Sequence, residues 1–185
     1  MKKQDIPWMN LKRQYDSIKG EIVPAVNDIL ESGNYILGQN VQRFEEELAQ
    51  FHSAKHAIGV ANGTDAIHLA LLAVGVKEGD EVITVPNTAV PTICAIKAAG
   101  ATPVFVDIHP DYYTIDASKI EAAITKRTKA IVPVHLFGQA CDMDAVLRIA
   151  KKHTLAVVED CAQAIGTHYR GKEHKGMVGT LGDIG

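Results

Sequence analysis

From residue 57 onward, short apolar runs alternate regularly with stretches of helical periodicity. Because two successive strands joined by a helix run in the same direction, this alternation predicts βαβ units, and therefore an α/β fold whose mostly parallel sheet has helices on both faces. Right-handed crossovers bring the carboxyl ends of the strands to one edge of the sheet, where open α/β sheets bind ligands. The expected strands are Ala57–Val60, Glu81–Val85, Pro103–Val106, Ala130–Val134 and Leu155–Val158, and the expected helices are Thr64–Val74, Thr88–Ala99, Ala117–Lys126 and Met143–His153.

The chain before residue 57 shows helical periodicity but no comparable strand pattern. Residues 1–10 are expected to form an extended arm, and the apolar spacing predicts helices over Leu11–Ser32 and Val41–Phe51. Pro24 lies inside the first of these runs and is expected to kink or split the helix, because proline has no backbone N–H to donate. After Val158, glycines crowd a stretch with little periodicity, so no regular element is expected there.

Composition narrows the functional class. The net charge of −3 over 185 residues argues against a nucleic-acid or membrane-surface role, because no basic excess is available to neutralise phosphates. The three cysteines are an odd number without CxxC spacing, which favours a reducing compartment over a disulfide framework. No signal peptide and no membrane-spanning run is recognised, so a cytoplasmic location is expected.

The first candidate site is Asn62-Gly63-Thr64-Asp65, at the junction between an expected strand and an expected helix. Backbone N–H groups at a helix N-terminus point outward and bind anions, and the Thr64 hydroxyl adds a donor. On local sequence alone, a simpler interpretation is that Asn62 or Thr64 caps the helix. No GxGxxG or P-loop pattern occurs, so dinucleotide binding of the Rossmann or P-loop kind has no support.

The second candidate is Asp160, which follows the expected last strand together with Glu159. A carboxylate at the carboxyl end of a strand faces the expected ligand edge. Asp160 could accept a hydrogen bond from a protonated ring nitrogen, which makes a pyridine ring an electron sink. Taken alone, an ordinary acidic residue leaving a strand is the simpler interpretation.

Other candidates carry less weight. Thr88-Ala89-Val90-Pro91 opens a helix at the same edge, and Pro91 suits a first helical turn. His135 ends another strand and could be a ligand or a base, although a lone histidine is more often a hydrogen-bonded structural residue. Cys161 has no evident base partner, and its acidic neighbour would raise the thiol pKa. No histidine spacing matches a standard metal motif, so no metal site is expected.

Taken in order, the segments resemble the DegT/DnrJ/EryC1/StrS family of pyridoxal-phosphate (PLP) dependent sugar aminotransferases. The stretches that carry the resemblance are IPWMNLKRQY, SGNYILGQNVQRFEEELAQF, AIGVANGTDAIHLAL, GDEVITVPNT, GATPVFVDI, VPVHLFGQACDMDAV, VVEDCAQAIG and VGTLGDIG. They cover nearly the whole chain, and the resemblance implies part of the large domain of a fold-type-I PLP enzyme.

The resemblance also implies roles for individual residues. Gly63 and Thr64 would bind the cofactor phosphate, Asp160 would pair with the pyridine nitrogen, and Gln163 would lie near the ring hydroxyl. Ala89 stands where relatives commonly carry an aromatic side chain that stacks on the cofactor ring, so stacking would be weaker or supplied elsewhere.

The family's Schiff-base lysine would fall beyond Gly185. The serine that helps to hold the phosphate and the small C-terminal domain would also lie beyond it. Residues 1–185 are therefore expected to comprise an N-terminal arm and a partial large PLP-binding domain. Lys172 and Lys175 are the nearest lysines in sequence, but they are expected on a surface loop and are not assigned the role. The chain by itself is expected to be inactive, and either poorly soluble or marginally stable.

For the full-length parent, the resemblance implies transfer of an amino group, usually from glutamate, to a keto group of a nucleotide-linked deoxysugar. Two alternatives stay open: a keto-sugar dehydratase of the same family, in which histidine replaces the lysine, and a non-catalytic fragment or interaction domain. A homodimer is expected, because fold-type-I enzymes build active sites across a dimer interface, and the arm with Trp8 and Met9 is a candidate contact.

Overall fold

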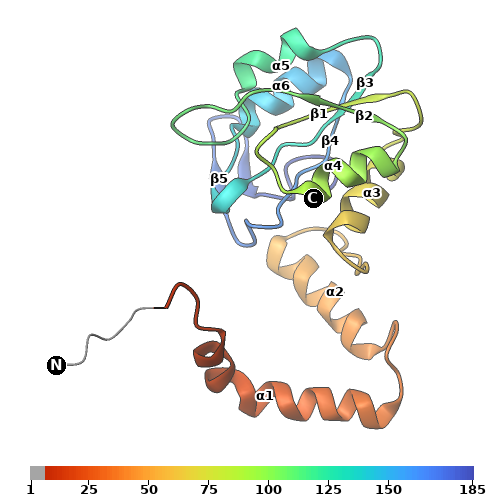
Figure 1. Ribbon diagram of the computed structural model, residues 1–185, viewed down its shortest axis with the longest axis vertical. Coiled ribbons are helices and arrows are strands. Elements are labelled where there is room, and N and C mark those ends of the chain that lie inside the picture. The colour runs from red at the N-terminus through yellow and green to blue at the C-terminus, as the bar shows by residue number, and fades with distance from the viewer. Residues whose placement is uncertain (1–6) are drawn as a thin grey trace, which may run out of the picture. The chain divides into compact units, whose positions relative to one another are not determined.

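The computed structural model of the protein describes residues 7–185, which form two compact units that divide after Glu46. The first unit contains helix α1, Leu11–Ser32, and the start of helix α2, Gln39–His52 (Figure 1). The expected arm lies partly outside the described residues, and its remainder, 7–10, has no helix or strand. No helix within residues 7–185 is both long enough and apolar enough to cross a lipid bilayer.

Helix α1 has well-defined signals at both ends. The Asn10 side chain accepts a hydrogen bond from the Arg13 N–H at 2.9 Å, and Gly33 ends the helix in the left-handed conformation with φ of 69°. Pro24 lies inside the helix, which continues as one element through it, so the expected split is wrong. A proline removes one hydrogen bond from the ladder, and the turns on either side keep theirs.

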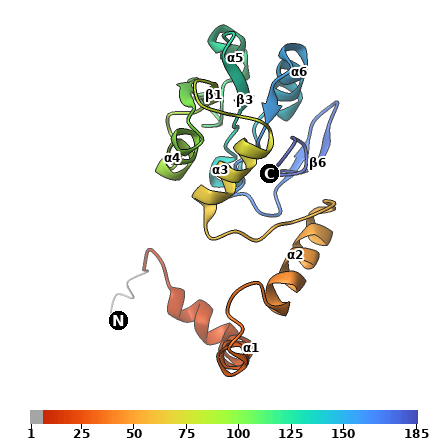
Figure 2. The ribbon, with the colours of Figure 1, turned by 90° about the vertical axis from the view of Figure 1, so that its right-hand side faces the viewer.

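The second unit is an α/β fold, as the sequence predicts. Its four-stranded sheet is parallel throughout and has the strand order β2-β1-β3-β4 (Figures 1 and 2). The elements in chain order are α3 Gly63–Ala73, β1 Glu81–Thr84, α4 Val90–Ala98, β2 Thr102–Phe105, α5 Ala117–Ala123, β3 Thr128–Ile131, a short 3₁₀ turn Leu136–Gly138, α6 Met143–His153, β4 Ala156–Val157, β5 His168–Arg170 and β6 Lys175–Met177.

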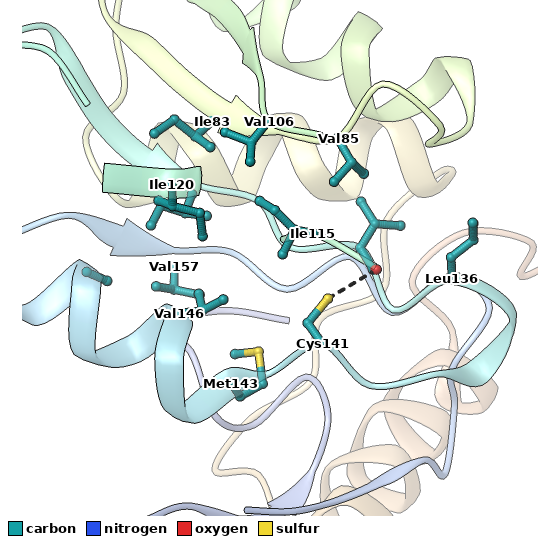
Figure 3. Packing of buried hydrophobic residues seen from close by; sticks show 13 residues of the cluster. Ile83, Val85, Val106, Ile115, Ile120, Leu136, Cys141, Met143, Val146 and Val157 are labelled. Atoms are coloured by element: carbon teal, nitrogen blue, oxygen red, sulfur yellow. Dashed lines mark hydrogen bonds between the residues drawn. The ribbon is translucent and has the colours of Figure 1, made fainter. Parts of the chain in front are cut away.

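Apolar side chains cover both faces of this sheet, because successive strand residues point to opposite sides. On one face, Val82 of β1 packs with Leu71 of α3 and Ile96 of α4. On the other face, the buried cluster includes Ile83 of the same strand and side chains from α5 and α6 (Figure 3). The two faces therefore bury separate cores, and α3 with α4 and α5 with α6 cover them in pairs.

One expected strand does not form. Residues 57–60 have no strand assignment, and Ile58 is 80% exposed. The β-branched residues there have strand propensity, but a strand also needs a partner whose ladder it can join. Tertiary pairing decides this, so the sequence-based prediction for Ala57–Val60 is wrong.

One hairpin was not anticipated. Strands β5 and β6 pair antiparallel within the glycine-rich stretch, which has no periodicity that would predict them. The Asp144 carboxylate, at the start of α6, holds their connecting loop by accepting the N–H groups of Lys172, Glu173 and His174 at 2.7, 3.1 and 2.8 Å. Gly171 leaves room for this approach, since a Cβ there would lie 2.4 Å from the Asp144 Oδ2 atom.

Asp144 should make the hairpin loop sensitive to acid. Burial opposes its ionisation, but the backbone N–H donors outweigh burial and hold the pKa at about 2, below the ordinary value of 3.8. Because the pKa is lower in the folded state, the stabilisation is present above about pH 4 and is lost as the pH falls toward about 2. We expect amide hydrogen exchange at residues 172–174 to rise relative to the core strands over this interval.

At neutral pH, Asp144→Asn should accelerate exchange at the same three amides, because the new side-chain amide offers one acceptor oxygen instead of two. Glu173→Gln, in the same loop, is the matched control, since the Glu173 side chain is largely exposed and pairs with Arg148 only at 3.7 Å. Equal exchange in the two variants would contradict the anchoring role.

Candidate functional site

The candidate site lies at the carboxyl edge of the sheet, where the β3 and β4 chains continue side by side beyond the regular strands. A further parallel bridge joins Val134 to Asp160. The His135 N–H donates to the Asp160 carbonyl at 3.1 Å, and the Asp160 N–H donates to the Pro133 carbonyl at 2.9 Å. The backbone N–H and carbonyl groups of Asp160 are therefore both held by the segment that follows β3.

Strand alternation sends the two acidic side chains of this segment to opposite faces. Val157 lies in the core beneath α5 and α6, whereas Val158 lies in the core beneath α3 and α4. If the alternation continues, Glu159 points to the same face as Val157, and Asp160 points to the same face as Val158. The hydrogen bonds agree, because Asp160 bonds to a side chain of α4.

The Asp160 carboxylate is buried but not saturated. It accepts the Thr92 hydroxyl on Oδ2 at 2.7 Å and the Ala162 N–H on Oδ1 at 3.2 Å, and the residue is only 7% exposed. The Thr88 hydroxyl lies 2.8 Å from that of Thr92. A carboxylate can accept about four hydrogen bonds, so capacity remains for a donor from a ligand. Thr92 was not predicted from the sequence, although its spacing of four residues from Thr88 was a possible signal.

Glu159 and His135 form a fully buried pair. The Cys141 N–H donates to His135 Nδ1 at 3.0 Å, so the ring proton is on Nε2, which donates to Glu159 Oε2 at 3.0 Å. Glu159 Oε1 accepts the N–H groups of Leu181 and Gly182 at 2.8 and 2.7 Å. Burial opposes the ionisation of Glu159, but these donors hold its pKa below the ordinary value. His135 is thus a structural residue, the simpler of its two interpretations.

Cys161 lies near this pair but adds no reactive site. One ligand atom from each of His135, Glu159 and Cys161 lies within 4.8 Å of the others. However, both nitrogens of His135 are committed, one as an acceptor and the other as a donor, so neither has a lone pair for a metal ion. Burial, together with the charges of Glu159 and Asp160, raises the pKa of the Cys161 thiol.

At the N-terminus of α3, the capping and anion-binding interpretations apply to different residues. Asn62 is the cap, because its side chain accepts the Asp65 N–H at 3.0 Å. The N–H groups of Gly63 and Thr64 and the Thr64 hydroxyl have no partner within residues 7–185. A Cβ on Gly63 would meet no atom within 4 Å, so the backbone is uncrowded on that side of Gly63.

Two amide side chains also have unused groups. Gln163 Oε1 accepts the Phe137 N–H at 2.8 Å, which leaves the exposed Gln163 NH₂ group free to donate. The Asn87 NH₂ group donates to the Tyr113 carbonyl at 3.0 Å, and its buried Oδ1 atom has no partner among the described residues. Asn87 was not predicted from the sequence.

Hydrogen bonds connect some of the predicted site residues but not all. Asp160 is joined through Thr92 to the start of α4, where Ala89 occupies the N-cap position without a side-chain cap. Gln163 lies three residues beyond Asp160 and is joined to the segment after β3. Among the described residues, no hydrogen bond joins Gly63 or Thr64 to Asp160.

Comparison with known proteins gives consistent results. A profile of the DegT/DnrJ/EryC1/StrS aminotransferase family matches residues 16–185. The chain is 51% identical over 178 residues to dTDP-3-amino-3,6-dideoxy-alpha-D-galactopyranose transaminase of Aneurinibacillus thermoaerophilus, covering 96% of this chain and 48% of that protein. It is 49% identical to a pleiotropic regulatory protein of Geobacillus stearothermophilus, again over 96% of this chain and 47% of that protein.

Solved structures show the same relationship. DesV of S. venezuelae superposes with a TM-score of 0.91 at 42% identity, covering 96% of this chain and 47% of that chain. NtdA of Bacillus subtilis, with bound cofactor PMP, superposes with a TM-score of 0.86 at 36% identity, covering 90% and 38%. The chain thus spans about half the length of the relatives it matches, 47% and 48% for the two proteins above.

The buried pair gives a stability prediction. In Glu159→Gln, the new NH₂ group would face the His135 Nε2–H, so two donors would meet without an acceptor. We expect a loss of about 3 kcal/mol in the free energy of unfolding, measured by urea denaturation. Glu78→Gln, an exposed carboxylate on the same unit, should change it by less than about 0.5 kcal/mol. Similar losses in the two variants would argue against the pair.

Proposed function

Because the chain belongs to the DegT/DnrJ/EryC1/StrS aminotransferase family, we propose that the whole protein is a PLP-dependent sugar aminotransferase. It transfers an amino group, from glutamate, to a keto group of a nucleotide-linked deoxysugar. The fold is that of the fold-type-I aminotransferases it superposes on. The observation that carries the proposal is Asp160, a buried carboxylate at the carboxyl edge of the sheet with hydrogen-bonding capacity to spare.

The unused groups of this chain fit PLP. Free donors on Gly63 and Thr64 at a helix N-terminus suit the phosphate. Asp160 suits the protonated pyridine nitrogen, whose positive charge it would balance. The cofactor, when bound, supplies an electron sink for the carbanion formed during amino transfer. We assign the role of the Schiff-base lysine to no residue among these 185.

Gln163 has the correct polarity for the ring hydroxyl. The Phe137 N–H occupies its carbonyl oxygen, so the group it presents outward is a donor. A donor stabilises an ionised ring oxygen, whereas the opposite amide orientation would repel it. Ala89 offers only a methyl group at the position of the expected stacking aromatic, so we propose that it contributes contact area without stacking.

The relatives narrow the substrate. Several have names that specify a 3-amino or 3-oxo sugar, including the transaminase of Aneurinibacillus thermoaerophilus and UDP-2-acetamido-2-deoxy-3-oxo-D-glucuronate aminotransferase of Pseudomonas aeruginosa. We therefore propose a 3-keto nucleotide sugar. Aminotransferase relatives support amino transfer over the dehydratase alternative.

We also propose that the whole protein is a homodimer. Apolar side chains on α3 and the start of α4 are exposed, including Leu69, Leu72 and Val90 at 50%, 46% and 71%. Such a group of exposed apolar side chains marks an interaction surface. Trp8 and Met9 remain a predicted contact, and the cytoplasmic location remains a prediction. Sedimentation analysis of the protein expressed from its own gene tests the dimer.

The function is tested directly with the protein expressed from its own gene. With PLP, glutamate and a panel of 3-keto and 4-keto nucleotide sugars, we expect the 3-amino sugar and 2-oxoglutarate in equal amounts. Asp160→Asn should leave the fold intact and reduce turnover by about 100-fold or more, since losing an anionic partner removes several kcal/mol of charge stabilisation. Near-normal turnover in this variant would reject the role of Asp160, and an absence of product from every sugar would reject the function.

The phosphate site gives a separate prediction. Thr64→Ala should weaken PLP binding by about 10- to 100-fold, the value of one hydrogen bond to a charged group, without changing the fold. Thr64→Ser keeps the hydroxyl and should bind nearly as tightly as the unmodified protein. Binding is measured by fluorescence titration with PLP. An unchanged affinity in Thr64→Ala would make Thr64 an ordinary residue of the first helical turn.

A further inference from the structure

We propose that Thr92, supported by Thr88, is a positioning residue for the cofactor: its hydroxyl fixes the Asp160 carboxylate so that the ring nitrogen of PLP stays protonated. The inference rests on the proposed function, since it concerns the pairing of Asp160 with the pyridine ring. Thr92 itself would not touch the cofactor through this interaction. It would act through Asp160.

The direction of each hydrogen bond follows from the protons available. An ionised carboxylate only accepts, so the Thr92 hydroxyl donates to Asp160 Oδ2 over the 2.7 Å that separates them. A threonine hydroxyl has one proton, and that of Thr92 is now used. The Thr88 hydroxyl, 2.8 Å away, must therefore donate to Thr92. The two threonines form a directed chain that ends on one oxygen of Asp160.

This series of hydrogen bonds is protected from water where Thr92 meets Asp160. Thr92 is only 1% exposed and Asp160 only 7%. In a buried setting, hydrogen bonds in series polarise one another, so Thr88 strengthens the bond that Thr92 makes. The β-branched Thr92 side chain is also restricted at χ1 in a helix, which limits the positions its hydroxyl can take. With the Ala162 N–H on Oδ1, both carboxylate oxygens are anchored.

Fixing the Asp160 carboxylate also fixes the position of its negative charge. Donors on both oxygens hold the negative charge of the carboxylate in one place, where it would stabilise the protonated ring nitrogen. Removing the Thr92 hydroxyl would weaken this stabilisation. It would also free the carboxylate to rotate, because the backbone N–H of Ala162 would be its single remaining anchor within residues 7–185.

Thr84 provides a matched control. The Thr84 side chain is as deeply buried and its hydroxyl donates to the Val132 carbonyl at 3.0 Å, while no hydrogen bond among the described residues joins it to Asp160. Thr84→Val and Thr92→Val therefore each delete one buried, hydrogen-bonded hydroxyl. Both should lower the thermal midpoint. Of these two variants, Thr92→Val should change the signal of the pyridine nitrogen and Thr84→Val should not, a difference that a purely structural role of Thr92 does not predict.

The experiment uses the protein expressed from its own gene, loaded with PLP labelled with ¹⁵N in the ring. In Thr92→Val, the ¹⁵N chemical shift should move toward that of neutral pyridine, and PLP should bind about tenfold more weakly. Thr92→Ser should restore both values, and Thr84→Val should change neither. Thr88→Val should shift the signal in the same direction by less, and it provides the test if Thr92→Val does not fold.

The outcomes separate the two claims. If the unmodified protein binds PLP with a protonated ring nitrogen and neither Thr92→Val nor Thr88→Val moves the ¹⁵N signal, the positioning role is wrong while the proposed function stands. An equal shift in Thr84→Val would likewise overturn it, by showing a general effect of lost stability. If the unmodified protein binds no PLP, the proposed function fails and this inference fails with it.

Discussion

The buried hydrogen bond between His135 and Glu159 joins four separate segments of the second unit. His135 follows β3 and Glu159 follows β4, while Cys141 precedes α6 and Leu181 belongs to the loop near residue 185. Because both side chains are out of contact with water, each polar atom needs its partner, and a change at one segment leaves a buried group unpaired at another. The pair therefore fixes the backbone on which Asp160 lies.

Glu159 and Asp160 show how one strand end supports two tasks. They are chemically similar neighbours, yet the pleat of the strand sends Glu159 toward the face covered by α5 and α6 and Asp160 toward the face covered by α3 and α4. Glu159 accepts three hydrogen bonds from within the protein and its side chain is fully buried, so a ligand cannot reach it. Asp160 receives one donor on each oxygen and keeps the rest of its capacity. The difference in hydrogen bonding, more than the difference in residue type, makes Asp160 the candidate for cofactor binding.

At the start of α3, different residues likewise serve helix capping and anion binding. Asn62 satisfies the Asp65 N–H and stabilises the helix, while the donors of Gly63 and Thr64 remain open to an anion. Capping and anion binding are commonly treated as competing explanations of one motif. Here they involve neighbouring residues and are compatible, because a helix N-terminus offers more free N–H groups than one cap can satisfy.

The sequence by itself determined the α/β fold, the parallel sheet and the family. Each of these depends on local periodicity or on residue order. Tertiary structure decided that residues 57–60 do not form a strand and that β5 and β6 pair, since pairing needs a partner from elsewhere in the chain. It also decided that Thr92 meets Asp160, 68 residues away in sequence, and that His135 is committed to the core. Contacts between distant residues leave no local pattern, because folding alone brings their side chains together.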